Sequence, residues 1–297
     1  MKKALAFINV NAGAVAAAGV EAIIAALHES CADAGWRVEI LSGEAMNIEE
    51  EAKKTRGYDA LISVGGDGTH LCIAEAAIDL DAPLLALPAG TVNLFCRDLG
   101  LPMNLKEAIA TGLAARPRRI DVGRIETAEK GARYFLNNIV FGAYAELAEA
   151  REGLRDGETL DDMNFALVAG AQAIAHAADI DYVVRLGGEE LVHAGAAVVI
   201  SNNAFTEAVD LIPRRARIDK GRLAIYFLRA KNGLGFMARL IEFLSTAGDA
   251  PAGREGERCQ VAASNGPTIF TLDGEPEESA APVAMSALAG ALPVLAP

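Results

Sequence analysis

The sequence predicts an α/β protein of two domains, an N-terminal domain built on a parallel sheet and a C-terminal domain that is a mostly antiparallel β-sandwich. Through about residue 120, short and continuous apolar runs alternate with segments of helical period. Strands that are apolar throughout are typical of parallel sheets covered by helices on both faces. Beyond residue 120, short strand-like segments dominate, which favours antiparallel sheets.

The elements of the N-terminal domain follow from these two periods. Strands are expected at Ala4–Val10, Arg37–Leu41, Tyr58–Val64 and Pro83–Leu87. Helices are expected from Val20 to Cys31, from Ile48 to Arg56, after the Gly65–Thr69 turn to about Asp79, and from Leu105 to Ala114. In a sheet of this kind ligands bind beyond the carboxyl ends of the strands.

The C-terminal domain is expected to contain strands at Ile120–Ile125, Tyr134–Phe141, Tyr182–Leu186, Leu191–Ile200, Leu223–Leu228, Gln260–Ala263 and Thr268–Leu272. Helices are expected at about 143–154, 162–177 and 233–246. A tight hairpin turn is predicted at Gly187-Gly188. The domains are assigned to residues 1–121, together with the tail at about 284–297, and to residues 122–283.

The composition limits the partners of this protein. The chain has 297 residues and a net charge of −13, and such an acidic surface repels nucleic acid. The four cysteines are scattered without a pair at zinc-ligand spacing, which favours reduced thiols. Met1-Lys2-Lys3 imitates the start of a signal peptide, but the apolar run is interrupted early and a first strand is favoured. No apolar run is long enough for a transmembrane helix.

The first turn with residues typical of a binding or catalytic site is Gly65-Gly66-Asp67-Gly68-Thr69, which lies between a strand and a helix. Glycines allow phosphate to approach the backbone, and a helix N-terminus offers unpaired N–H groups. Asp67 itself would repel phosphate, so its presence indicates a Mg²⁺ ion. The alternative is a tight turn with Asp67 as a helix cap.

The second turn, Pro88-Ala89-Gly90-Thr91-Val92-Asn93, also follows an apolar strand. Gly90 and Thr91 could give phosphate an N–H and a hydroxyl, and Asn93 could orient a group through its amide. By itself this segment also fits an ordinary Pro-Gly turn capped by Thr91. The two turns on successive strands support each other as parts of one phosphate site.

The two turns, with Leu94-Phe95 after the second, resemble the catalytic domain of the diacylglycerol kinase family, which includes bacterial lipid kinases, ceramide kinases and sphingosine kinases. The resemblance continues in order along the chain. It includes Asn9-Val10-Asn11-Ala12-Gly13, Ile120-Asp121-Val122-Gly123, Phe135-Leu136-Asn137-Asn138, Val199-Ile200-Ser201-Asn202-Asn203 and Leu272-Asp273-Gly274-Glu275.

The resemblance implies roles for individual residues, with ATP and Mg²⁺ as cofactors. Nucleotide binding would involve Asn9, Gly13, Gly65, Gly66, Asp67, Gly68, Thr69, Gly90, Thr91 and Asn93. Asp67 would also serve the metal and join Thr91 and Asp121 in a hydrogen-bonded network. Asp273 would be the general base and Glu275 would serve the metal or nucleotide, while Asp219 resembles a ligand of a structural magnesium site.

The function implied is an ATP-dependent lipid kinase, a transferase of lipid metabolism and phospholipid biosynthesis that is cytoplasmic and peripherally associated with the membrane. His70-Leu71-Cys72 and Leu94 depart from the family pattern, so the acceptor stays open. His70 is either a functional base or a solvated residue of the first helical turn. The basic clusters Arg116–Arg119 and Arg214–Arg217 are either solvated faces or docking sites for anionic lipid heads.

Two other functions compete with this one. The first is a kinase of a soluble alcohol, because NAD kinase shares the Gly-Gly-Asp-Gly-Thr turn and His70-Leu71 is closer to its pattern. The second is a catalytically silent nucleotide-binding regulatory protein. The oligomeric state does not follow from the sequence, and a homodimer remains open.

Overall fold

The computed structural model describes residues 2–142, 181–194, 197–209, 212–215, 217–228 and 254–297. These residues form two compact units, Met1–Val122 with Ala289–Pro297, and Gly123–Leu288. The helices expected at about 143–154, 162–177 and 233–246 lie outside the described residues. Among the described helices, none has the length and apolar character that crossing a bilayer requires.

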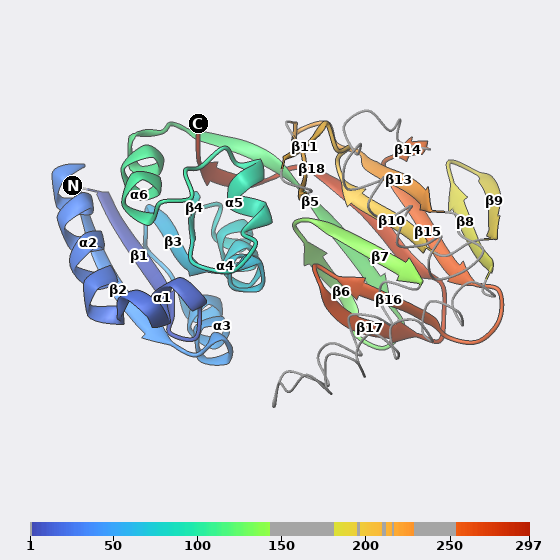
Figure 1. The fold of residues 1–297 in the computed structure, drawn as a ribbon, viewed down its shortest axis with the longest axis horizontal. Helices are drawn as coiled ribbons and strands as arrows, with labels where there is room; N and C mark the ends of the chain where they lie inside the picture. Colours follow the sequence, from blue (N-terminus) through green and yellow to red (C-terminus); the bar gives the residue numbers. More distant parts are fainter. Residues whose placement is uncertain (1, 143–180, 195–196, 210–211, 216, 229–253) are drawn as a thin grey trace. The chain divides into compact units, whose positions relative to one another are not determined.

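The first unit is a parallel sheet with helices, as the sequence predicts (Figure 1). Its strands are β1 (Lys2–Asn9), β2 (Trp36–Gly43), β3 (Ala60–Gly65) and β4 (Leu84–Pro88), in the order β2-β1-β3-β4. Its helices are α1 (Gly13–Ala18), α2 (Val20–Asp33), α3 (Ala45–Lys54), α4 (Asp67–Leu80), α5 (Leu94–Asp98) and α6 (Leu105–Ala114). Every residue of the central strands β3 and β4 is buried, which explains their continuous apolar sequence.

The strand order creates a switch point between β1 and β3. The chain moves from β1 outward to β2, and then returns past β1 to β3 and continues to β4. Because crossovers between parallel strands are right-handed, α2 covers one face of the sheet while α3 and α4 cover the other. The connections that leave β1 and β3 therefore diverge, and such a point is where open α/β sheets bind ligands.

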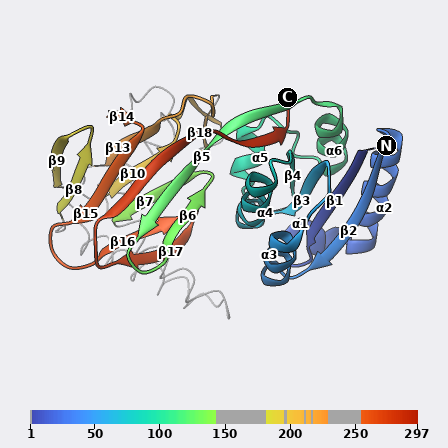
Figure 2. The same cartoon turned by 180° about the vertical axis from the view of Figure 1, so that it is seen from behind.

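The C-terminal tail is part of the first unit, where it continues a long strand. Strand β18 (Val283–Leu295) pairs with β4 in parallel, with Val294 beside Leu84. The earlier part of β18 pairs with β15 (Arg258–Ala263) in antiparallel fashion within the second unit. Figure 2 allows this long strand and β5 (Pro117–Thr127) to be followed from behind.

The second unit is a mostly antiparallel sandwich, which confirms the predicted fold class. One sheet contains β5, β6 (Gly131–Phe135), β8 (Asp181–Leu186), β9 (Glu189–Ala194), β15 and β18. The other has the order β14-β13-β10-β7-β16-β17, with β7 (Asn138–Gly142), β10 (Ala197–Asn202), β13 (Leu223–Leu228), β14 (Arg254–Gly256), β16 (Thr268–Leu272) and β17 (Glu275–Ser279). A small ribbon joins β11 (Glu207–Val209) to β12 (Ile212–Arg214). Residues of both sheets, among them Phe135, Tyr182, Phe141 and Phe270, form one core.

Two strands predicted as continuous are each divided in the structure. The expected strand Tyr134–Phe141 is β6 and β7 with a turn at Leu136-Asn137, and the expected strand Leu191–Ile200 is β9 and β10. Both predictions were wrong because a run rich in apolar residues gives no sign of where one strand ends and the next begins. The predicted hairpin between β8 and β9 is confirmed, with φ angles of +58° and +88° at Gly187 and Gly188.

Candidate functional site

Three loops of the first unit meet beyond the carboxyl ends of β1, β3 and β4. The side-chain amide of Asn9 donates a hydrogen bond of 2.9 Å to the Thr69 hydroxyl, across the switch point between β1 and β3. The Ala14 N–H donates to the Ala89 carbonyl at 3.0 Å, and the Ala89 N–H donates to the Gly65 carbonyl at 2.9 Å. The three segments that the sequence singled out therefore form one neighbourhood.

The two glycine-rich turns, Gly65–Thr69 and Pro88–Asn93, are in close contact through their glycines. A Cβ atom added to Gly90 would lie 2.6 Å from the Cα of Gly66, and one added to Gly65 would lie 2.5 Å from the Cβ of Thr69. Both distances are far below van der Waals contact, and the first involves backbone that cannot move aside. Glycine is therefore required for packing at Gly65 and Gly90, whatever the site binds.

The N-terminus of α4 is open, and Gly68 has a different role from these two glycines. The capping residue Gly66 makes no side-chain hydrogen bond to the first turn of α4. A Cβ atom on Gly68 would meet nothing within 4 Å. The first N–H groups of a helix have no partner within the helix and lie at the positive end of its dipole, so this helix end suits a phosphate group.

The Asp67 carboxylate holds the two turns together. It accepts a hydrogen bond of 3.1 Å from the Leu94 N–H and one of 2.8 Å from the Phe95 N–H, at the start of α5. Asp67 thus caps α5, the helix that follows the second turn, and not α4, the helix to which Asp67 belongs. The two bonds go to different oxygens, and a carboxylate oxygen can accept more than one hydrogen bond or a metal.

The second turn is closed by Asn93. Its φ angle is +55°, and its side-chain amide both accepts from the Gly90 N–H and donates to the Gly90 carbonyl, each at 2.8 Å. Asn93 is buried and supports the turn, whereas Thr91 is exposed at its tip. Of the two side chains, Thr91 is therefore the one within reach of a ligand.

The expected solvated position of His70 is wrong. The side chain is fully buried, with Nδ1 at 2.8 Å from the Ser63 hydroxyl and Nε2 at 3.4 Å from the Cys96 sulfur. Burial lowers the pKa of His70 to about 4, against an opposing effect of the Asp67 carboxylate. His70 is consequently a neutral core residue at physiological pH.

Asp121 lies on β5 and is 2% exposed. Its carboxylate accepts a hydrogen bond of 2.9 Å from the Gly290 N–H on β18. This bond ties the returning tail to the strand that leaves the first unit. The hydrogen bonds described for Asp67 and Asp121 thus fix different segments, α5 and β18.

In the second unit, Asp273 occupies the Asp-Gly turn between β16 and β17, with φ angles of +47° at Asp273 and +102° at Gly274. The backbone geometry is that of a tight hairpin turn, but the carboxylate is turned inward. It accepts hydrogen bonds of 2.8, 2.9 and 3.0 Å from the N–H groups of Leu136, Asn137 and Asn138. Burial raises the pKa of Asp273 to about 6, while the three N–H donors and Arg215 oppose this rise.

Arg215 binds carbonyl groups of the Leu136-Asn137 turn, whose N–H groups bind Asp273. The sequence did not predict this contact. The guanidinium donates to the carbonyls of Leu136 at 2.8 Å, Asn137 at 3.1 Å and Asn202 at 2.7 Å, and Arg215 is 2% exposed. The expectation that Arg215 belongs to a solvated or lipid-docking basic face is therefore wrong. Its neighbours Arg214 and Arg217 gave it the appearance of a surface cluster.

The remaining predicted site residues are at the surface. Glu275 is exposed at the start of β17. Asp219 is exposed and forms an ion pair with Arg217, with Nε–Oδ1 and Nη2–Oδ2 distances of 2.8 and 3.1 Å. Within the described part of the chain, no group of three or more His, Cys, Asp or Glu side chains is placed to hold a metal. A cation at Asp67 would therefore need further ligands from a nucleotide or from water.

The fold is that of an α/β protein with a parallel sheet in its first unit and a mostly antiparallel second unit, and two glycine-rich turns lie beside the switch point of the parallel sheet. Residues 3–125 match the family model of the diacylglycerol kinase catalytic domain. This match confirms the resemblance seen in the sequence, and it covers the first unit without its C-terminal tail and β5 as far as Ile125.

Two curated relatives carry the name "Probable lipid kinase YegS-like". The one from Pseudomonas fluorescens is 40% identical over 111 residues, which are 35% of this chain and 34% of the relative. The one from Stenotrophomonas maltophilia is 28% identical over 258 residues, which are 82% of this chain and 80% of the relative. The chain thus matches about a third of the length of the first relative. This chain has the same fold as a diacylglycerol kinase structure from Bacillus anthracis, with a TM-score of 0.69 and 19% sequence identity. The superposition covers 100% of this chain and 97% of the Bacillus chain.

Proposed function

We propose that this protein is a lipid kinase, which transfers the terminal phosphoryl group of ATP to a hydroxyl group of a lipid such as diacylglycerol. The observation that supports the proposal most directly is the open N-terminus of α4, at the switch point of a domain that matches lipid kinases. The match to named lipid kinases favours a lipid acceptor over a soluble one.

In this proposal the ATP phosphates bind the N–H groups at the start of α4, where Gly68 leaves room for them. Asn9, Gly13 and Thr91 would complete the phosphate site. The Asp67 carboxylate is the group that would bind Mg²⁺. Each of its oxygens accepts one hydrogen bond from α5 and has a further lone pair for a metal, at the N-terminus of α4. Bound there, the ion would neutralise phosphate charge as the phosphoryl group is transferred.

Asp273 is the proposed general base. It would take the proton of the acceptor hydroxyl as that oxygen attacks the phosphorus, and ADP would leave with the electron pair of the broken P–O bond. A pKa of about 6 keeps the carboxylate ionised at neutral pH and basic enough to accept a proton. Its three N–H partners and Arg215 would hold it in one orientation. Glu275 is proposed to serve the metal or the nucleotide, and Asp219 a second, structural magnesium ion.

The proposed place of action is the cytoplasmic membrane surface, where a peripheral protein can reach a lipid acceptor. The acidic overall charge requires any contact with anionic lipids to be local.

The substitution Asp273→Asn tests the base. An amide cannot accept the proton, so kcat should fall by about 100-fold or more, the typical contribution of a general base. Asp181→Asn is the matched control, since it makes the same change at an exposed position of the same unit. Nucleotide affinity should be unchanged in Asp273→Asn, because the proposed phosphate site is in the first unit.

Stability must be followed in parallel, because the amide would face three N–H donors with one acceptor oxygen. Refolding yield and circular dichroism report whether the variant is folded. Full turnover by a folded Asp273→Asn variant would show that another group takes the proton.

A further inference from the structure

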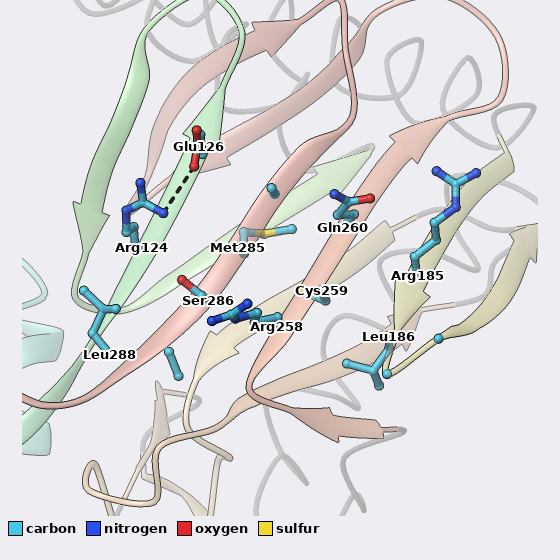
Figure 3. Close-up of a pocket in the computed structure, with 14 residues that line it drawn as sticks. Arg124, Glu126, Arg185, Leu186, Arg258, Cys259, Gln260, Met285, Ser286 and Leu288 are labelled. Carbon is cyan, nitrogen blue, oxygen red and sulfur yellow. Dashed lines mark ion pairs between the residues drawn. The ribbon is translucent and has the colours of Figure 1, made fainter.

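A groove of about 550 Å³ lies on one sheet of the second unit, and no proposed catalytic or nucleotide-binding residue lines it (Figure 3). Its lining comes from β5, β8, β15, β18 and the Gly187-Gly188 turn. Along these strands Ile125, Val184 and Val261 belong to the sandwich core, and the polar residues that line the groove alternate with core positions. Cys259 and Met285 belong to the core and also line the groove. The groove is therefore on the outer face of its sheet.

Short side chains on β18 produce the hollow. Ala284 and Ser286 lie on the outer face of this strand, between longer side chains on its two neighbours. On one side the register places Gln260 opposite Ala284 and Arg258 opposite Ser286. On the other side, β5 contributes Arg124 and Glu126. In Figure 3, Ser286 lies between the guanidinium groups of Arg124 and Arg258.

The charges in the groove leave one arginine unmatched. Arg124 forms an ion pair with Glu126 at 3.2 Å, and Arg185 forms one with Glu190 at 2.9 Å. Arg258 is exposed and makes no ion pair or hydrogen bond through its side chain with any residue that the structure describes. In a chain with a net charge of −13, an uncompensated guanidinium beside a hollow is a local site for an anion.

The donor set suits phosphate. Directly opposite residues of an antiparallel pair have Cβ atoms about 5 Å apart, so the guanidinium of Arg258 and the hydroxyl of Ser286 can bind one group together. Ser286, like Arg258, has no side-chain partner among the described residues. A guanidinium presents a fork of N–H donors that matches two phosphate oxygens, and the hydroxyl supplies a further donor.

We propose that this groove binds an organic phosphodiester, with its phosphate on Arg258 and Ser286. A phosphodiester carries one negative charge, which matches the single unpaired arginine. Glu126 would accept a hydrogen bond from a hydroxyl or ammonium group of the same ligand. The ion pair of Arg124 and Glu126 is exposed and therefore weak, so both side chains can reorient toward a ligand. The site does not depend on the proposed kinase activity.

Such a phosphodiester is either the headgroup of a phospholipid or a free, soluble molecule. Two probes distinguish them. Glycerophosphoglycerol is the soluble probe, measured by calorimetry. The membrane probe is cosedimentation with phosphatidylcholine vesicles that do or do not contain phosphatidylglycerol. Binding of both probes indicates a membrane headgroup, and binding of the soluble probe alone indicates a free metabolite.

Two variants locate the site, and each changes an outer-face residue without touching the core. Arg258→Ala removes the charge and should weaken binding by about tenfold or more, the effect of losing a charged hydrogen bond. Ala284→Leu fills the hollow at constant charge and should also weaken it. The control is Arg37→Ala, an exposed strand arginine of the first unit that, like Arg124, has a glutamate two residues later.

Three results would overturn the proposal. The first is that neither probe binds the unmodified protein. The second is that both probes bind Arg258→Ala and Ala284→Leu as tightly as they bind the unmodified protein. The third is that Gly68→Ala abolishes probe binding while the groove variants keep it, which would assign the phosphate to the α4 site instead.

Discussion

Replacing Gly68 with alanine separates the structural role of the glycine-rich turn from its proposed role in binding phosphate. The added methyl group meets nothing within 4 Å, and Gly68 lies in the first turn of α4, so the fold tolerates alanine. Alanine favours a helix by roughly 0.5–1 kcal/mol over glycine, and the variant should be slightly more stable. The same methyl group occupies the space into which the phosphate would fit. Loss of one charged hydrogen bond, about 1.5–3 kcal/mol, predicts that ATP affinity falls by roughly 10-fold to 100-fold.

Isothermal calorimetry with a nonhydrolysable ATP analogue and thermal unfolding together check this prediction. Gly43→Ala is the control, because its added methyl group also meets nothing closer than 3.7 Å but lies outside the turn. Gly90→Ala gives the opposite pattern, since its clash with Gly66 should lower the melting temperature. An unchanged ATP affinity in a stable Gly68→Ala variant would refute the assignment of the α4 N-terminus as the phosphate site.

Two further predictions concern the pH dependence of stability. The folded protein raises the pKa of Asp273 from 3.8 to about 6, so this carboxyl contributes stability below pH 3.8 that is lost as the pH rises through about 6. The change is roughly 3 kcal/mol, and in denaturant titrations the difference in stability between the unmodified protein and Asp273→Asn should vary by this amount between about pH 4 and pH 6. His70 acts in the opposite direction, since its pKa falls from 6.5 to about 4 on folding, and stability should be lost by roughly 3 kcal/mol as the pH falls through this range. A His70→Leu variant with the same pH slope as the unmodified protein would contradict the neutral, buried state.

The sequence predicted the first unit well because its signals are local. The helix from Leu105 to Ala114 was predicted to the residue, and the strands of the parallel sheet were each placed within a few residues. Helices α1 and α5 were missed because each is shorter than two turns of regular period. What fixes α5 is the Asp67 carboxylate, a contact between positions far apart in the chain.

The interior polar contacts could not be predicted from local sequence. His70 appears as a helix-start residue, and only the packing of α4 against its neighbours reveals that it is buried. Arg215 looks like part of a basic surface cluster, yet it binds carbonyl groups contributed by the turn at Leu136-Asn137. Asp273 was found through its family resemblance, and its inward carboxylate depends on the same distant turn. Each of these contacts joins different elements or turns of the fold, which the periodicity of the sequence does not report.

Phosphoryl transfer from labelled ATP is the most direct test of the proposed activity. The purified protein is incubated with Mg²⁺, radiolabelled ATP and mixed micelles that contain diacylglycerol, ceramide, sphingosine or monoacylglycerol in turn, with soluble NAD as a control acceptor. The proposal predicts that label enters one organic-phase product and that Asp273→Asn abolishes this transfer. Label in NAD would instead identify a kinase of a soluble alcohol. Bound ATP with no label in any acceptor would contradict the lipid kinase and favour a silent nucleotide-binding protein.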